Sequence, residues 1–212
     1  ILRLHNRIRV LCGLPEREGH VAQPWTDAEP APVLGRVELR YRIRVEKPVR
    51  GAELAIEESG TWSLMVDGRR VSTRARGWWV DEAIELGRLP AFDVGEHEIV
   101  LARDFTRKTE LEWNYLLGDF GVRLAGRHAT ITEPVRSLAF GDWSSQGLPF
   151  YTGNVTYHFT LDERDGVATG VDFTGFKGAL LSVVVDDGPP RPVAFAPFRY
   201  DLPLRRKNKT RL

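Results

Sequence analysis

The sequence predicts an all-β protein built from two tandem antiparallel jelly-roll β-sandwiches. Short segments alternate apolar and polar residues, as expected of strands that bury one face. Turn signals separate these segments at a spacing of about 8–12 residues, which is typical of sandwiches and barrels. Much of the pattern occurs twice, and after residue 36 no segment keeps helical periodicity over ten or more residues.

Residues 1–36 are expected to form an N-terminal extension or linker, because the stretch 13–36 carries four prolines and no periodicity. The first sandwich is predicted over residues 37–127. It opens with a strand in which every second residue is apolar, from Val37 to Val45, and the residues between them are charged. Further strands are predicted over residues 52–56, 62–66, 78–84, 97–102 and 110–117.

An internal repeat predicts the second sandwich, over residues 128–212. The segments "LMVDGRRV" (64–71) and "WWVD" (78–81) recur as "VVVDDGPPRPV" (183–193) and "FRYD" (198–201). In this alignment Asp67 matches Asp187, Trp78 matches Phe198, and Asp81 matches Asp201. The second copy ends as its closing strand begins, so we expect a truncated sandwich with an open sheet edge.

The charge balance of the chain limits the classes of molecule that it is expected to bind. Lys and Arg total 30 against 29 Asp and Glu, and this balance predicts neither a nucleic-acid nor a membrane partner. We interpret the basic run 205–211 as one charged face of a strand. The longest apolar runs, such as 179–185, are too short to span a bilayer. Cys12 is the only cysteine and the five histidines lack ligand spacing, so no metal site is predicted from them.

Two segments carry a family resemblance: "LEWNYLLGDFGVRL" (111–124) and "GDWSSQGLPFYTGNVTYHF" (141–159). They resemble the C-terminal galactose-binding-like β-sandwich region of bacterial glycoside hydrolases, in particular the family 106 α-L-rhamnosidases and related proteins. The resemblance covers residues 37–212. It implies a non-catalytic accessory region that supports the catalytic domain of the same parent protein and binds carbohydrate. It also implies a bacterial protein that is exported or periplasmic. Two alternatives stay open, a free-standing carbohydrate-binding module and a glycosidase with its site inside this chain.

Four residues are candidates for carbohydrate contact, namely Trp79, Trp143, Tyr151 and Asp81. An exposed aromatic ring can stack on the apolar face of a sugar, whereas a buried ring fills the core. The repeat retains an aromatic residue at the position of Trp78 and replaces Trp79 by Arg199. We therefore predict that Trp78 belongs to the core and that Trp79 faces the surface.

Asp81 and Asp201 allow two interpretations. They could accept sugar hydroxyls or bind a structural calcium ion, which prefers hard oxygen ligands. They could instead accept backbone N–H bonds that fix the following loop. Recurrence in both copies favours the structural role, and no cofactor is predicted.

No catalytic residue is predicted. Glu110 and Glu112 lie two apart on an expected strand and so share one face, but a solvated strand face explains them. The loop "GDWSSQGLPFYTG" (141–153) is interpreted as a joint between the two sandwiches. In this interpretation Leu148, Phe150 and Tyr151 fill the seam, and Trp143 stays the residue to test for sugar contact.

Overall fold

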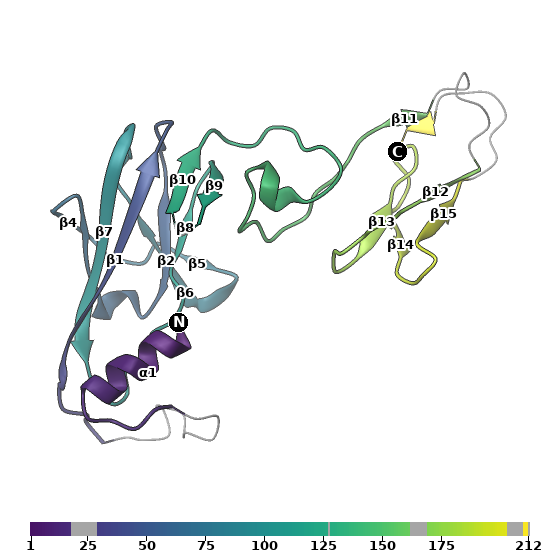
Figure 1. Ribbon diagram of the computed structural model, residues 1–212. Coiled ribbons are helices and arrows are strands. Elements are labelled where there is room, and N and C mark those ends of the chain that lie inside the picture. Colours follow the sequence, from purple (N-terminus) through teal and green to yellow (C-terminus); the bar gives the residue numbers. More distant parts are fainter. Residues whose placement is uncertain (18–28, 127, 162–168, 203–209, 212) are drawn as a thin grey trace. The chain divides into compact units, whose positions relative to one another are not determined.

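The computed structural model describes residues 1–17, 29–126, 128–161, 169–202 and 210–211. These residues divide into two compact units, Ile1–Tyr151 and Thr152–Leu212. The mainly-β prediction is confirmed, with one unpredicted helix, α1 (Leu2–Leu11), in the first unit (Figure 1). No helix in the described ranges is both long and apolar enough to cross a membrane.

A six-stranded sheet forms one layer of the first unit, in the order β4-β3-β7-β1-β10-β9. Its strands are β1 (Gly35–Val45), β3 (Ser63–Val66), β4 (Arg69–Val71), β7 (Gly95–Phe105), β9 (Gly121–Ala125) and β10 (His128–Thr132). Strand β1 pairs with β7 along its whole length. It also pairs in parallel with β10, because β9 and β10 form a hairpin that returns β10 in the direction of β1. The sheet is therefore mixed, whereas the sequence predicted a purely antiparallel sheet.

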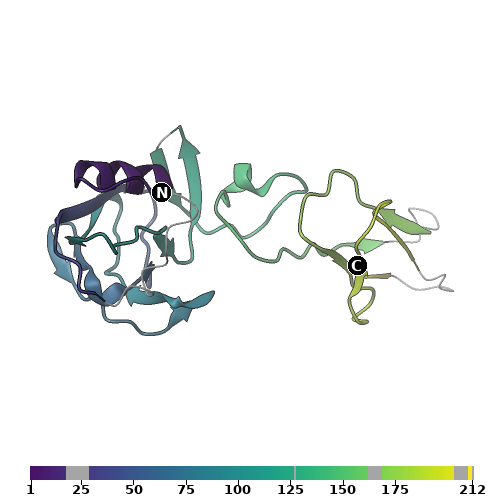
Figure 2. The same ribbon diagram turned by 90° about the horizontal axis from the view of Figure 1, so that it is seen from below.

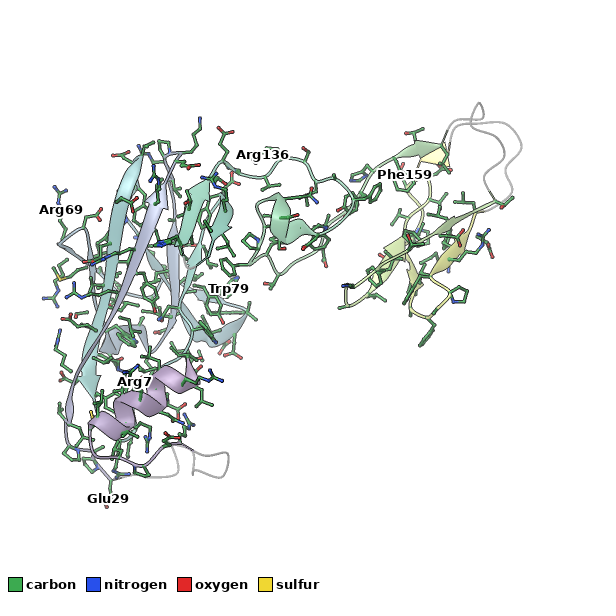
Figure 3. All side chains as sticks on the ribbon, in the orientation of Figure 1. Arg7, Glu29, Arg69, Trp79, Arg136 and Phe159 are labelled. Carbon is green, nitrogen blue, oxygen red and sulfur yellow. The ribbon has the colours of Figure 1, made fainter. Side chains whose placement is uncertain are left out.

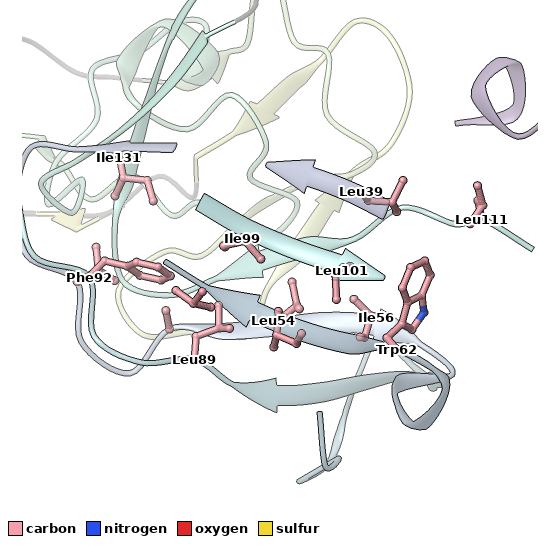
Figure 4. Close-up of a cluster of buried hydrophobic side chains, with 14 of the residues drawn as sticks. Leu39, Leu54, Ile56, Trp62, Leu89, Phe92, Ile99, Leu101, Leu111 and Ile131 are labelled. Atoms are coloured by element: carbon pink, nitrogen blue, oxygen red, sulfur yellow. The ribbon is translucent and has the colours of Figure 1, made fainter. Parts of the chain in front are cut away.

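A four-stranded antiparallel sheet, in the order β5-β6-β2-β8, faces the same core. Its strands are β2 (Glu53–Glu57), β5 (Trp78–Trp79), β6 (Asp81–Arg88) and β8 (Tyr115–Leu117). Figure 4 shows Leu39, Ile99 and Leu101 of the first sheet beside Leu54 and Ile56 of β2. Burial of such side chains is the main stabilising contribution to this unit, at roughly 25 cal/mol per Å² of apolar surface.

The alternation predicted for β1 matches its two faces. Val37, Leu39 and Val45 are buried in the core. The residues between them point to the other face, where Arg40 lies 2.6 Å from Glu38 and 3.3 Å from Glu98. Such exposed ion pairs stabilise by at most about 1 kcal/mol each, so this face is a solvated, charge-balanced surface.

The Asp67-Gly68 turn joins β3 and β4 as predicted. Both residues have positive φ angles, 49° and 74°, as a two-residue hairpin turn with matching twist requires. Asp67 also ties this turn to β7, because its Oδ1 accepts the Glu98 N–H at 2.9 Å. Its Oδ2 lies 2.7 Å from Nδ1 of His97, a side chain at the start of the same strand.

His97 makes hydrogen bonds through both ring nitrogens. Its Nε2 lies 2.8 Å from the carbonyl oxygen of Asp93. A carboxylate and a carbonyl can only accept, so His97 donates both bonds at once only in its imidazolium form, with a proton on each ring nitrogen. Burial alone lowers the pKa of His97, but the bonds to Asp67 and Asp93 outweigh burial and raise the pKa above its usual value. Burial likewise raises the pKa of Asp67, and its bonds to His97 and Glu98 bring the pKa below its usual value.

The described residues of the second unit form three short antiparallel pairs, β11–β16, β12–β15 and β13–β14. These strands are β11 (Thr160–Leu161), β12 (Gly170–Asp172), β13 (Leu181–Val183), β14 (Arg191–Val193), β15 (Arg199–Asp201) and β16 (Thr210–Arg211). The pairs are nested in the same order as β1–β7, β2–β6 and β3–β4, which agrees with the internal repeat. Residues 184–190 replace the two-residue turn of the first copy. Most of the predicted closing strand and of the basic run lies outside the described residues.

Helix α1 lies at the end of the first unit where β1 begins and β7 ends (Figures 1 and 2). Ile1, Ile8 and Cys12 pack against the core, and the ring of His5 meets that of Phe105 edge-on. This helix lies within residues 1–36, which were expected to form an extension or linker, and the side chains that it buries most deeply, His5 and Arg9, are polar. Contrary to that expectation, residues 1–17 pack against the core of the first unit.

Substituting His97→Gln is expected to lower the free energy of unfolding by about 1 kcal/mol more at pH 6 than at pH 9. A raised folded pKa means that the stabilisation is fully present below the ordinary histidine pKa and disappears as pH rises through the folded pKa. The figure is small for a charged hydrogen bond because the Asp67 side chain is 45% exposed. Urea unfolding at both pH values measures the difference, with Arg42→Gln as the control. Equal losses at both pH values would contradict a charged His97.

Candidate functional site

An aromatic pair spans the outer face of the four-stranded sheet. Trp79 lies on β5 and Tyr115 on β8, the two edge strands, yet their ring centroids are 4.9 Å apart with planes tilted by 56°. The paired residues Leu54 and Leu116 face the core, so Ala55 and Tyr115 face the other way. Ala55 is fully buried on this outer face, which shows that neighbouring side chains cover the centre of the sheet. Trp79 is labelled in Figure 3.

Two further exposed tryptophans lie close to this pair in the sequence. Trp78 is 55% exposed and Trp113 is 61% exposed. The prediction that Trp78 belongs to the core is wrong, because β5 is a two-residue edge strand and Trp78 pairs only with Glu85. Trp79 is the less exposed of the two, since it packs on Tyr115. Trp78 is cross-strand from Glu85, which pairs with the core residue Ile56, so Trp78 points away from the side of the sheet that carries Trp79. We call Trp79 and Tyr115 the aromatic face.

Carboxylates lie beside the aromatic face. Glu57 is two residues from Ala55 on the same strand and face, and burial raises its pKa. Repulsion from Glu112, Glu58, Glu110 and Asp81, in this order of strength, raises the pKa further. These four carboxylates therefore lie within electrostatic reach of Glu57. Glu110 is held by Arg17 at 2.7 Å, so its carboxylate has a structural partner.

Asp81 and Asp201 have different partners despite their matching positions in the repeat. The Oδ1 atom of Asp81 accepts the backbone N–H of Ala83 at 2.8 Å, as the structural interpretation predicted. Asp201 instead accepts from Nε of Arg199 at 2.8 Å, a side chain on its own strand. The prediction of a backbone bond is confirmed for Asp81, whereas most of the loop that follows Asp201 lies outside the described residues. Both carboxylates are exposed to solvent.

Val80 forms the tip between β5 and β6, and its φ angle is +68°. A β-branched residue is strained in this left-handed region, because its side chain crowds the following backbone. The strained tip holds Trp79 and Asp81 as cross-strand partners. Strain of this kind is often found at binding sites, where surrounding structure enforces it.

A second aromatic pair lies in the loop 139–151. Trp143 begins a short 3₁₀ helix, Trp143–Gln146, in which the Asp142 side chain accepts the Ser144 N–H at 2.9 Å. The ring of Trp143 meets that of Tyr151 edge-on, with centroids 6.5 Å apart. The Val122 N–H donates to the Gly147 carbonyl at 2.7 Å, which anchors the loop to β9.

This loop also exposes the large apolar side chains of Phe140 and Phe150. The division between the two compact units falls directly after Tyr151, at the end of the loop. Packing of Leu148, Phe150 and Tyr151 into a seam between sandwiches stays a prediction. The predicted boundary after residue 127 also stays a prediction, although β10 belongs to the sheet of the first unit.

A polar pocket of about 360 Å³ opens near the end of β7. Arg103 lines it and is held by Glu58 at 2.7 Å, with its guanidinium 5.1 Å from the centre of the Trp62 ring. Thr106 and Thr109 bond to each other within the loop that closes the pocket. The lining groups thus bond to one another, which favours a structural role.

The candidates therefore form two aromatic pairs, one containing Trp79 and beside Asp81, the other joining Trp143 to Tyr151. The sequence analysis missed Tyr115 and Glu57, although the alternation of their strands placed both on an outward face. Within the described ranges, no group of three or more His, Cys, Asp or Glu side chains could hold a metal ion. No protein-family model, curated protein or solved structure matches the chain.

Substituting Val80→Asn is expected to raise the free energy of unfolding by about 1 kcal/mol, because asparagine tolerates the left-handed conformation. Thermal and urea unfolding measure the change. Val94→Asn is the matched control, since Val94 is also an exposed valine but does not have a positive φ angle. A variant less stable than the wild type would show that Val80 is not strained.

Proposed function

We propose that this chain is a non-catalytic accessory region of a polysaccharide-degrading glycoside hydrolase of the α-L-rhamnosidase-like type. In this proposal its β-rich units are galactose-binding-like jelly rolls that support the catalytic domain of the parent protein and bind carbohydrate. The observation that carries the proposal is the Trp79–Tyr115 pair on the outer face of a sheet. The family assignment itself rests on the resemblance of residues 111–124 and 141–159.

The aromatic face has the chemistry that sugars need. The C–H groups of a pyranose ring stack on indole and phenol rings. This contact buries apolar surface, while the N–H of tryptophan and the O–H of tyrosine stay available for hydrogen bonds. Carboxylates accept bonds from sugar hydroxyls, and charge-assisted bonds are the stronger kind. Trp113, two residues before Tyr115 in the sequence, is also exposed, and exposed apolar side chains that gather into a patch mark interaction sites. Asp81 and Glu57 supply the neighbouring oxygen atoms.

The loop 139–151 offers a second platform of the same type. Trp143 and Tyr151 form its pair, and Phe140 and Phe150 are exposed beside them in sequence. Two platforms on one unit suit a polymeric ligand, because a second contact on the same chain binds at a high effective concentration. A carbohydrate polymer is therefore a better fit than a single sugar.

Trp79→Ala is expected to weaken polysaccharide binding about tenfold, since the stacking of one aromatic ring contributes about 1.4 kcal/mol. Affinity gel electrophoresis against a panel of soluble polysaccharides, one of them rich in rhamnose, measures the retardation. Trp143→Ala tests the loop platform in the same gels. Phe195→Ala, which removes an exposed aromatic side chain of the second unit, is the control and should bind normally. Wild-type protein that shows no retardation by any polysaccharide at millimolar sugar would contradict the proposal.

A catalytic site inside the chain is the second candidate, and Glu57 is the observation that favours it. Its raised pKa is the property of a general acid, and the neighbouring Glu112 carboxylate contributes to the rise. Glycoside hydrolysis uses such a pair of carboxyl groups. The sequence prediction considered carboxylate pairs within one strand, where Glu57 and Glu58 point apart. Only Glu110 and Glu112 were expected to share a face, and Glu110 is engaged by Arg17.

We expect the purified chain to leave 4-nitrophenyl glycosides intact, because the accessory proposal places the catalytic residues elsewhere in the parent protein. Release of nitrophenolate, followed by absorbance, is the measurement. Hydrolysis that Glu57→Gln abolishes and Glu53→Gln preserves would overturn the accessory proposal. Glu53 is a suitable control because it lies at the other end of the same strand.

A further inference from the structure

Helix α1 docks with an unusual distribution of side chains. Its deepest contacts are made by His5 and Arg9, both buried. Several of its large apolar side chains are exposed instead, namely Leu2, Leu4, Val10 and Leu11. Ile1, Ile8 and Cys12 are its partly buried apolar contacts with the core. The helix is therefore held by a few apolar contacts and by hydrogen bonds of polar side chains. Its docking is sensitive to the charge of these polar side chains.

His5 is only 3% exposed and packs edge-on against the fully buried Phe105, with ring centroids 6.1 Å apart. The ring bonds to the backbone of Thr109. Its Nε2 atom is buried and has no hydrogen-bond partner among the described residues. A neutral imidazole tolerates this site, because an unprotonated Nε2 leaves no unmatched donor. An imidazolium would bury an N–H without an acceptor, which is costly.

The groups around His5 also disfavour a positive charge. Arg9, on the same helix, donates from Nε to the Pro15 carbonyl at 2.9 Å and from a terminal nitrogen to the Arg107 carbonyl at 3.2 Å. Arg17, on the segment after the helix, lies 2.7 Å from Glu110. Two guanidinium groups thus face His5, and Glu110 opposes them while already paired.

We propose that His5 is a proton-operated latch, which docks α1 on the core while neutral and releases the helix when protonated. The proposal is independent of carbohydrate binding. Burial, together with repulsion from Arg9 and Arg17, lowers the pKa of His5 below its ordinary value, against the opposing effects of Glu110 and Thr109. Docking is therefore weakened as pH falls below the ordinary histidine pKa of about 6.5, because only the released helix takes up the proton readily.

Cys12 reports the release, because it is the only thiol and packs beside Gly35 at the end of α1. Labelling with 4,4′-dithiodipyridine is measured on the folded chain and on the chain in urea at the same pH. The ratio of the two rates removes the intrinsic pH dependence of the thiol. Between pH 7.5 and 5.5 this ratio is expected to rise about tenfold, the proton linkage of one histidine that stays neutral when docked.

His5→Phe keeps the aromatic contact with Phe105 and cannot take up a proton, so its labelling ratio should not change with pH. His5→Gln serves as a second non-titrating variant if phenylalanine disturbs the packing. His128→Gln removes an exposed histidine on β10 and should keep the tenfold rise. NMR of the His5 ring should show a neutral imidazole at pH 6 in the folded chain. A charged ring at that pH, or a tenfold rise that persists in both His5 variants, would overturn the proposal.

Discussion

The pairing of β1 with β7 is the interaction on which the rest of the first unit depends. The two strands pair without interruption from Gly35 with Phe105 to Val45 with Gly95. One face of this ladder supplies Leu39, Ile99 and Leu101 to the core, and the other carries exposed ion pairs. A one-residue slip would exchange the two faces, so burial fixes the register strongly. Both ends of β7 are then fixed. His97 lies near the first end, and His5 of α1 packs against Phe105 at the other.

The same register positions the aromatic face. Leu54 and Ile56 of β2 must face the core that β1 and β7 define, so Ala55 and Glu57 necessarily face outward. Ala55 is small, and its position between Leu86 and Tyr115 leaves room for large rings to meet above the sheet. The contact between Trp79 and Tyr115 therefore follows from core packing on the opposite face. A candidate binding surface and the hydrophobic core are two consequences of one strand pattern.

Local patterns predicted the parts of the fold that local chemistry determines. The alternation of β1 and the Asp67-Gly68 turn are encoded in adjacent residues, and both are correct. The parallel pairing of β1 with β10 and the contact of Trp79 with Tyr115 join distant segments, and no pattern within one segment specifies them. Helix α1 was not predicted, because residues 1–36 were interpreted as one extension from the prolines of 13–36, and the side chains that the helix buries most deeply, His5 and Arg9, are polar. Trp78 was misplaced because the repeat conserves residue type, whereas exposure depends on the sheet edge.

The two histidine sites give the ends of β7 opposite responses to acid. The charged form of His97 makes both bonds, to Asp67 and Asp93, so a fall in pH strengthens this site until Asp67 itself takes up a proton below its usual pKa. His5 is neutral when docked, so the same fall in pH weakens its site. Acid therefore favours local release of α1 while the β3–β4 turn stays attached to the central ladder. Separate low-stability segments on a stable core are how proteins open locally without unfolding. Acid thus stabilises the site of His97, at the Val45–Gly95 end of the ladder, and destabilises the site of His5, at the Gly35–Phe105 end.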